Sequence, residues 1–163
     1  NDRYYWDQLG PERLRCLREL PQETEFWFSG RRFRLFHGRP VMPELYTVAD
    51  DRELLQSFLV DAKGVPYDGL LYADAHRQAM RTLSPGIIVN TGSVGNAMGM
   101  PKCCYALLEG EEGRTPAPLE IRLRQLDYNR EQAVRDAEAA DGLPIKEAYI
   151  REIQTGIYSR SHG

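Results

Sequence analysis

Three short segments of the sequence carry side chains that could bind a metal ion, and each follows an apolar run. His37 and Gly38 end one expected strand, Asp74 and His76 follow a second, and residues 90–95 follow a third. Loops at the carboxyl ends of strands in α/β sheets converge and commonly hold ligands, so we expect these segments to share one cleft. Imidazole and carboxylate groups suit divalent metals. Taken singly, each segment also fits a structural role, because a strand-end histidine often makes only a structural hydrogen bond.

The third segment, Asn90-Thr91-Gly92-Ser93-Val94-Gly95, is open to several interpretations. It is not a phosphate-binding P-loop, since no Gly-Lys-Ser/Thr follows it. It is not a nucleophile elbow either, because Ser93 directly follows Gly92 and no triad partner is evident. A loop between strands that uses glycine for positive φ remains an alternative. Asn90, Gly92 and Ser93 are the candidate substrate-loop residues.

The apolar pattern predicts the elements that position these segments. Strands are expected at 25–29, 32–37, 70–72, 87–89, 104–108 and 119–126, and helices at 11–20, from 50 to before Gly64, from Asn129 to Gly142, and at 144–156. Capping-box pairs, Asp50 with Glu53 and Asn129 with Gln132, indicate the starts of two helices. The pattern is that of a mixed α/β chain with polar residues at the ends of its strands.

Composition excludes several classes of protein. A chain of 163 residues suits one domain, and 42% hydrophobic with 28% charged residues is ordinary for a globular protein. A net charge of -3 argues against general nucleic-acid binding. No apolar stretch approaches the roughly 20 residues of a membrane span. The cysteines number three, without CxxC spacing, which fits reduced thiols and a cytoplasmic protein.

The order of these motifs resembles the C-terminal part of the calcineurin-like metallophosphoesterases, especially their small prokaryotic phosphodiesterase-like branch. In that family a strand ends in His-Gly, a second ends near Gly-His-Thr-His, and a third leads into Asn-Pro-Gly-Ser-Val-Gly. His37-Gly38, Ala73–His76 and Ile87–Gly95 take these places. The likeness continues through residues 119–144 and 153–156. The resemblance implies an α/β fold that is part of a β-sandwich flanked by helices. It also implies a single domain, with core elements in residues 1–108 and a C-terminal strand and helices in residues 109–163.

The resemblance also implies a reaction and a set of ligands. Such enzymes hydrolyse phosphomonoesters or phosphodiesters with two divalent metal ions, which bind the phosphate and activate a water. His37 and Asp74 would serve one metal and His76 the other. Asn1-Asp2 takes the place of the end of a Gly-Asn-His-Asp motif, with Asn1 where the family has His, which makes Asp2 a candidate catalytic residue. The sequence does not choose among Mn, Mg, Fe, Ni and Zn.

The sequence departs from the family pattern at its most functional positions. Asp74 replaces the first histidine of Gly-His-Thr-His, and this harder ligand favours Mg or Mn. Thr91 replaces the usual proline. The Asp-x-His and Gly-Asp motifs that precede these elements in the family, and supply about half of the ligands, are absent from the chain. We therefore expect a phosphoesterase that needs a missing N-terminal segment or, alternatively, a degenerate member that binds a ligand or protein without turnover.

Two further expectations concern partners. The substrate would be a phosphorylated small molecule or a phosphodiester, and its identity is not readable from the sequence. A sheet that lacks part of its family's strands would expose an apolar face and an unpaired edge. We therefore expect self-association, through the strand at 33–37 or the strand at 87–90.

Overall fold

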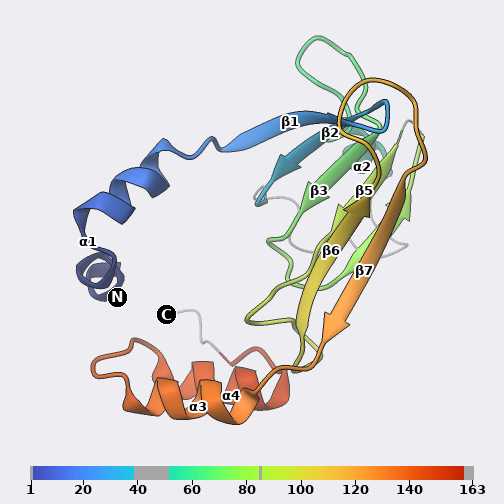
Figure 1. The fold of residues 1–163 in the computed structure, drawn as a ribbon. Helices are drawn as coiled ribbons and strands as arrows, with labels where there is room; N and C mark the ends of the chain where they lie inside the picture. The colour runs from blue at the N-terminus through green and yellow to red at the C-terminus, as the bar shows by residue number, and fades with distance from the viewer. Residues whose placement is uncertain (1, 39–51, 85, 160–163) are drawn as a thin grey trace.

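The computed structural model describes residues 2–38, 52–84 and 86–159 (Figure 1). Within these ranges the helices are α1 (Asp2–Glu19), α2 (Arg52–Ser57), α3 (Arg130–Ala139) and α4 (Lys146–Thr155). The strands are β1 (Glu23–Phe28), β2 (Arg31–Phe36), β3 (Gly69–Tyr72), β4 (Ala79–Thr82), β5 (Ile87–Asn90), β6 (Cys103–Glu109) and β7 (Glu120–Leu126). The mixed α/β class expected from the sequence is confirmed. The capping position predicted at Asp50 lies outside the described residues.

The strands form a five-stranded sheet in the order β1-β2-β3-β5-β4 and a separate β6-β7 pair. The three central strands, β2, β3 and β5, run parallel, with Phe33 opposite Gly69 and Gly69 opposite Ile87. The antiparallel strands β1 and β4 lie at the two edges. All four residues of β3 are buried, as befits a central strand covered on both faces.

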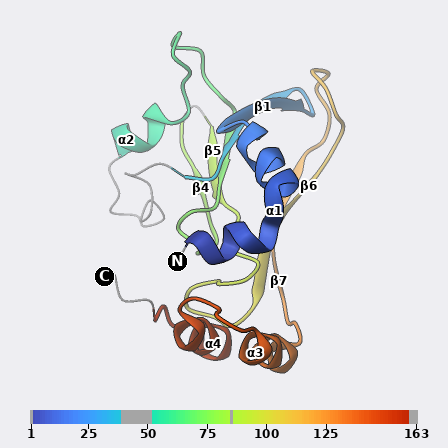
Figure 2. The ribbon, with the colours of Figure 1, turned by 90° about the vertical axis from the view of Figure 1, so that its left-hand side faces the viewer.

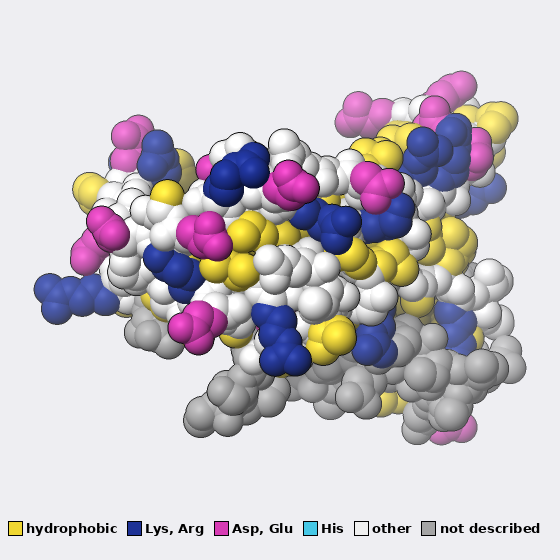
Figure 3. All heavy atoms as spheres, turned by 90° about the horizontal axis from the view of Figure 1, so that it is seen from below, with side chains coloured by type: hydrophobic (Ala, Val, Ile, Leu, Met, Phe, Trp, Pro, Cys, Tyr) yellow, Lys and Arg dark blue, Asp and Glu magenta, His cyan; other side chains and the backbone are white. Residues whose placement is uncertain are grey.

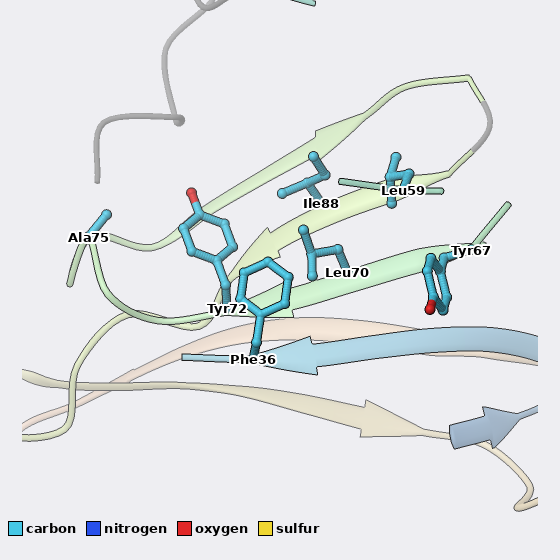
Figure 4. Close-up of a cluster of buried hydrophobic side chains, with 7 residues drawn as sticks. All are labelled: Phe36, Leu59, Tyr67, Leu70, Tyr72, Ala75 and Ile88. Atoms are coloured by element: carbon cyan, nitrogen blue, oxygen red, sulfur yellow. The ribbon is translucent and has the colours of Figure 1, made fainter. Parts of the chain in front are cut away.

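Each face of the five-stranded sheet has its own apolar cluster. On one face Phe33, Leu71 and Val89 pack against apolar residues of β6 and β7, which include Ala106 and Leu123. The opposite face carries a second cluster, drawn in Figure 4, of Phe36, Leu59, Tyr67, Leu70, Tyr72, Ala75 and Ile88. The β6-β7 pair therefore covers one face of the larger sheet, which gives the sandwich arrangement that the family resemblance implied.

The helices partly differ from the sequence prediction. Helix α1 begins at Asp2 rather than at Pro11, and it bends at Gly10, where φ is 70° and Pro11 follows. Figures 1 and 2 show α1 extending away from the sheets. Trp6 and Leu17 on this helix are more than half exposed. No helix of the described residues is long and apolar enough to span a membrane.

The predicted start of α3 and the predicted end of α4 are confirmed, whereas α3 ends at Ala139 rather than at Gly142. The Asn129 side chain accepts a hydrogen bond from the Gln132 backbone at 2.9 Å, which satisfies one free N–H group at the start of α3. The reciprocal half of the capping box does not form, because the Gln132 side-chain oxygen accepts a hydrogen bond from Arg135 instead. Gly156 ends α4 in the left-handed conformation.

Figure 3 shows that acidic, basic and apolar side chains are interspersed on the face seen from below.

The expectation that strands 33–37 and 87–90 offer unpaired edges is wrong. β2 lies between β1 and β3, and β5 lies between β3 and β4, so the backbone groups of both strands face neighbours on each side. For β5 the prediction failed because β4 was not recognised in the sequence: it has only four residues, and none of them is buried. For β2 it failed because β1, a strand that was predicted, pairs with it along its whole length. Self-association through another surface stays a prediction.

A charged network joins β1 and β2 to the loop before β3. The Arg32 guanidinium pairs with Glu25 at 2.7 Å and Asp61 at 3.0 Å, and its central carbon lies 4.3 Å from the centre of the Tyr67 ring. The Tyr67 hydroxyl donates a hydrogen bond to Glu25. Burial and this bond to a carboxylate raise the pKa of Tyr67 to about 12. The network fixes the residues that lead into the central strand.

Packing between the two sheets predicts how strongly one buried side chain contributes to the free energy of unfolding. Phe33 is fully buried, and its ring stacks on that of Phe26 with the centres 5.4 Å apart. We expect Phe33→Ala to lower the free energy of unfolding by about 3–5 kcal/mol, because it removes buried apolar area and leaves a cavity. Leu17→Ala, at an exposed position on α1, should change it by less than about 0.5 kcal/mol. Urea unfolding of both variants checks this, and equal effects would contradict it.

The raised pKa of Tyr67 predicts a pH effect at high pH. A tyrosine in the unfolded chain ionises near its ordinary value of about 10, whereas Tyr67 in the folded chain ionises at about 12. Between these values the folded state holds one more proton, so its stability falls as pH rises. The stability difference between wild type and Tyr67→Phe should therefore shrink from pH 10 to 12. Urea unfolding at each pH measures it, and a constant difference would show that Tyr67 ionises normally.

Candidate functional site

The three segments singled out in the sequence follow neighbouring parallel strands. His37 follows β2, Asp74 and His76 follow β3, and Thr91 follows β5. Because β2, β3 and β5 are parallel and adjacent, their carboxyl ends lie at the same edge of the sheet (Figure 1). This edge carries the candidate site. The roles of these residues as metal ligands stay a prediction.

His37 and Asp74 form a direct pair at this edge. His37 Nε2 lies 3.4 Å from Asp74 Oδ1, and the His37 side chain is 75% exposed. The pair is held by the backbone, because the His37 carbonyl accepts hydrogen bonds from the N–H groups of Ala73 and Asp74, both at 2.9 Å. Gly38 permits the close approach, since a Cβ at this position would overlap the Asp74 side chain. The two segments are thus joined by backbone bonds as well as by their side chains.

His76 has an unusual conformation. Its φ is 58°, in the left-handed region that non-glycine residues rarely adopt and that costs about 1–3 kcal/mol. Its backbone N–H donates to the Ala73 carbonyl at 2.8 Å, which closes a tight turn after β3. Its Nδ1 atom is buried and has no hydrogen-bond partner among the described residues. Strain and an unpaired nitrogen on one residue are typical of a functional position.

Hydrogen bonds within the loop hold most of the substrate-loop residues in place. Asn90 is fully buried, and its Oδ1 accepts a hydrogen bond from Gly92 N at 2.9 Å. Gly92 has φ of 82°, and a Cβ there would overlap Cys104 and Gln78. Ser93 Oγ accepts a hydrogen bond from Asn96 N at 3.0 Å. The buried Asn90 side chain therefore fixes the start of the loop, and Gly92 supplies the positive φ that the sequence suggested.

Gln78 ties this loop to the second sheet, a role that the sequence analysis missed. Its Nε2 lies within hydrogen-bond distance of the carbonyls of Thr91 (3.3 Å), Tyr105 (2.9 Å) and Arg124 (3.0 Å). Since an amide has two hydrogens, these carbonyls share them. Nothing in the sequence marks Gln78, because its three acceptors are backbone groups on different elements.

Unpartnered polar atoms gather in this region. Across the described residues, few buried side-chain nitrogens and oxygens lack a hydrogen-bond partner. Four of them are His76 Nδ1, Gln78 Oε1, Asn90 Nδ2 and Asn96 Oδ1. Buried polar groups are nearly always paired, so four such atoms between residues 76 and 96 set this edge apart from the rest of the fold.

The pair of His37 and Asp74 fits a metal ion, whereas a closed two-metal site is not present in the described residues. Two ligands about 2.0–2.1 Å from a tetrahedral ion such as Zn²⁺ lie about 3.4 Å apart, which equals the separation of His37 Nε2 and Asp74 Oδ1. The same distance fits an ion pair with protonated His37. Neighbouring ligands of an octahedral ion such as Mg²⁺ lie about 2.9 Å apart, so this ion would draw the two side chains closer together. Within residues 2–38, 52–84 and 86–159, no group of three or more His, Cys, Asp or Glu is placed to hold a metal. Asp2 begins α1, and its side chain lies outside the described part.

A small cavity lies beside His76. Its volume is about 210 Å³, and it is lined by His76, Arg77, Gln78, Ala97, Met98, Met100, Cys104 and Gln125. Burial is the main cause that raises the pKa of the Cys104 thiol, so this thiol is neutral at physiological pH. The larger cavities in the described part of the chain, such as the one lined by Tyr128 and Val134, are lined by none of the predicted site residues.

Comparison with known proteins identifies the fold. No protein-family model matches the sequence, and no curated protein matches it. The structure of a hypothetical protein from Pyrococcus horikoshii matches 94% of this chain and 57% of its own length, with a TM-score of 0.65 and 21% identity. The structure of a metallophosphoesterase from Sphaerobacter thermophilus matches 93% of this chain and 64% of its own length, with a TM-score of 0.61 and 18% identity.

The likeness to these two structures covers nearly the whole chain, while the chain spans less than two thirds of either of them. At such identities, agreement of this extent demonstrates a common fold. It confirms at that level the resemblance seen in the order of the His-Gly, Asp-x-His and Asn-Thr-Gly-Ser segments. This chain has the fold of the metallophosphoesterases.

Proposed function

We propose that this chain is part of a metal-dependent phosphoesterase and supplies ligands from the carboxyl edge of its central sheet. The observation that supports this most is the pair of His37 and Asp74, with nitrogen and oxygen 3.4 Å apart at the ends of adjacent parallel strands. The strained His76, with its buried unpartnered nitrogen, lies in the same turn as Asp74. The fold is that of proteins with this chemistry.

Each residue has a separate task in this proposal. His37 and Asp74 hold one divalent ion, and His76 holds a second. When bound, such ions neutralise the phosphate charge and supply an activated water. Gly38 admits Asp74 to its position, and the loop at Asn90–Ser93 closes the substrate side. The substrate is a phosphomonoester or phosphodiester.

Further ligands are needed for turnover. His37 and Asp74 give one ion at most two protein ligands, and His76 gives the other ion one, whereas two-metal hydrolysis needs both ions placed at once. We propose that an additional segment of the same fold, covalently attached or separate, supplies the remaining ligands. The solved neighbours have more chain than the part that matches here.

A second function, ligand or protein binding without turnover, has an observation in its favour. Asp74 replaces an imidazole and already pairs with His37, and the described residues contain no three-ligand group. With a protonated His37 the two side chains form an ion pair that needs no metal. The two functions differ in what happens when the additional ligands are provided.

The ligand count predicts the activity of the chain. We expect no appreciable hydrolysis of an aryl phosphodiester by the 163-residue chain with excess Mn²⁺, because too few ligands place the two ions. Adding an N-terminal metallophosphoesterase segment with its Asp-x-His and Gly-Asp motifs should restore hydrolysis. Release of the coloured phenol measures the rate.

Histidine variants separate the two functions in the completed protein. His76→Ala should abolish the restored hydrolysis, whereas His162→Ala, at the histidine for which the sequence indicates no role, should leave it unchanged. Robust Mn²⁺-dependent turnover by the chain alone would refute the ligand count. Inactivity of the completed protein toward several phosphoesters would favour the binding function.

The closeness of Gly38 to Asp74 predicts an effect on metal binding. Gly38→Ala should push Asp74 away from His37, and we expect it to weaken Co²⁺ binding by about 10–100-fold, the usual result of disturbing a ligand's support. Gly95→Ala is the matched control, because a Cβ at Gly95 meets nothing within 4 Å. Co²⁺ absorption spectra report both affinities. Equal affinities in the two variants would mean that Asp74 is not a ligand.

A further inference from the structure

Glu152 is a buried carboxylate on α4, remote in sequence from the candidate site. Its side chain is almost completely buried, with 2% of the residue exposed. Its Oε2 accepts a hydrogen bond from Asn96 Nδ2 at 2.9 Å, and its Oε1 accepts one from Ser159 N at 3.0 Å. A buried charge is costly unless it is well bonded, so these contacts strongly favour one arrangement of the groups around it.

The partner of Glu152 belongs to the loop that leaves the candidate site. Asn96 is also buried, and its backbone N–H donates to Ser93 Oγ at 3.0 Å. The carbonyl of Ser93 in turn accepts a hydrogen bond from Cys104 N at 2.9 Å. A continuous path of hydrogen bonds therefore runs from Glu152 through Asn96 to Ser93, one of the predicted substrate-loop residues.

The end of α4 contacts this loop at a second point. Gly99 N donates to the Gly156 carbonyl at 2.9 Å. A Cβ at Gly156 would overlap the backbone of Met100, so the helix end fits closely against the loop. Two contacts, one through side chains and one through backbone, thus hold residues 96–100 to the end of the helix.

We propose that Glu152 is a positioning residue: the C-terminal helix α4 holds the loop from Ser93 to Met100 in place through the Glu152–Asn96 bond. A carboxylate only accepts hydrogen bonds, so it turns the Asn96 amide with Nδ2 toward α4 and leaves Oδ1 facing away. Helix α4 is thereby part of the support of the carboxyl edge of the sheet. Its importance for catalysis rests on the proposed function, whereas the contacts themselves do not.

Exchanging the donor and the acceptor tests the proposal. Asn96→Asp places two carboxylates against each other, and we expect backbone amide exchange at position 96, Gly99 and Ser159 to become about tenfold faster or more. Adding Glu152→Gln restores a donor facing the new carboxylate and keeps an oxygen for Ser159 N. The double variant should return these rates to within about threefold of wild type, since its hydrogen bonds again match. Amide exchange followed by NMR measures each site without metal or substrate.

Core amides and a matched variant distinguish local positioning from general destabilisation. Exchange at Leu70 and Ile88, in the central strands, should stay unchanged in every variant. Glu147→Gln makes the same chemical change at an exposed position of α4 and should leave the loop rates as in wild type. If Asn96→Asp does not fold, Glu152→Gln alone takes its place in the test. The single side-chain oxygen of the new glutamine then faces the N–H groups of both Asn96 Nδ2 and Ser159 N, so amide exchange in the loop should become faster. The double variant should reverse this increase.

Two results would overturn the proposal. Loop exchange that is the same in the single and double variants would show that Glu152 and Asn96 do not act on each other. Exchange that rises equally in the loop and in the core would show that the pair serves only global stability. Failure of the proposed phosphoesterase function would leave these measurements unaffected, because they require no activity.

Discussion

Parallel hydrogen bonding among β2, β3 and β5 is the constraint on which the candidate site depends. The register that sets Gly69 opposite both Phe33 and Ile87 brings the carboxyl ends of three separate strands to one edge. His37, Asp74 and Thr91 then become neighbours although long stretches of chain separate them. The backbone itself completes the arrangement, because the His37 carbonyl accepts hydrogen bonds from the two residues that follow β3. A slip of one residue would turn the apolar side chains away from their clusters, so packing on both faces fixes the register.

The two faces of the sheet are stabilised in different ways. One is closed by β6 and β7 through aliphatic and aromatic contacts. The other combines an apolar cluster with the network of Arg32, Glu25, Asp61 and Tyr67, in which each charge has an opposite partner and the phenol is kept neutral by burial. This network holds the loop before β3 and therefore the strand from which Asp74 and His76 project. Gln78 and Glu152 act similarly at the opposite end of the strands, where they bond the loops to β6, β7 and α4.

The described residues at the carboxyl edge of the sheet do not form a complete two-metal site, but several unusual features gather there. An imidazole and a carboxylate at ligand spacing, a strained second imidazole and four unpartnered buried polar atoms occur together. A purely structural loop has no need of such a concentration. Both proposed functions, hydrolysis with additional ligands and binding without turnover, use the same residues, and they differ in whether a second set of ligands can be brought to them.

The sequence by itself determined the local elements and the order of the candidate ligands. Apolar runs marked β3 and β5, the Asn129 side chain indicated the start of α3, and Gly156 indicated the end of α4, because each of these signals acts within a few residues. Its order of motifs also pointed to the metallophosphoesterase fold. Only the tertiary structure decided which distant groups meet. The edge strand β4 has no apolar pattern of its own and is defined by pairing with β5. Asn96 and Glu152 are 56 residues apart, and Gln78 binds backbone carbonyls that no sequence pattern marks. Such contacts depend on how whole elements pack, and a side chain's type does not reveal the partner that packing will give it.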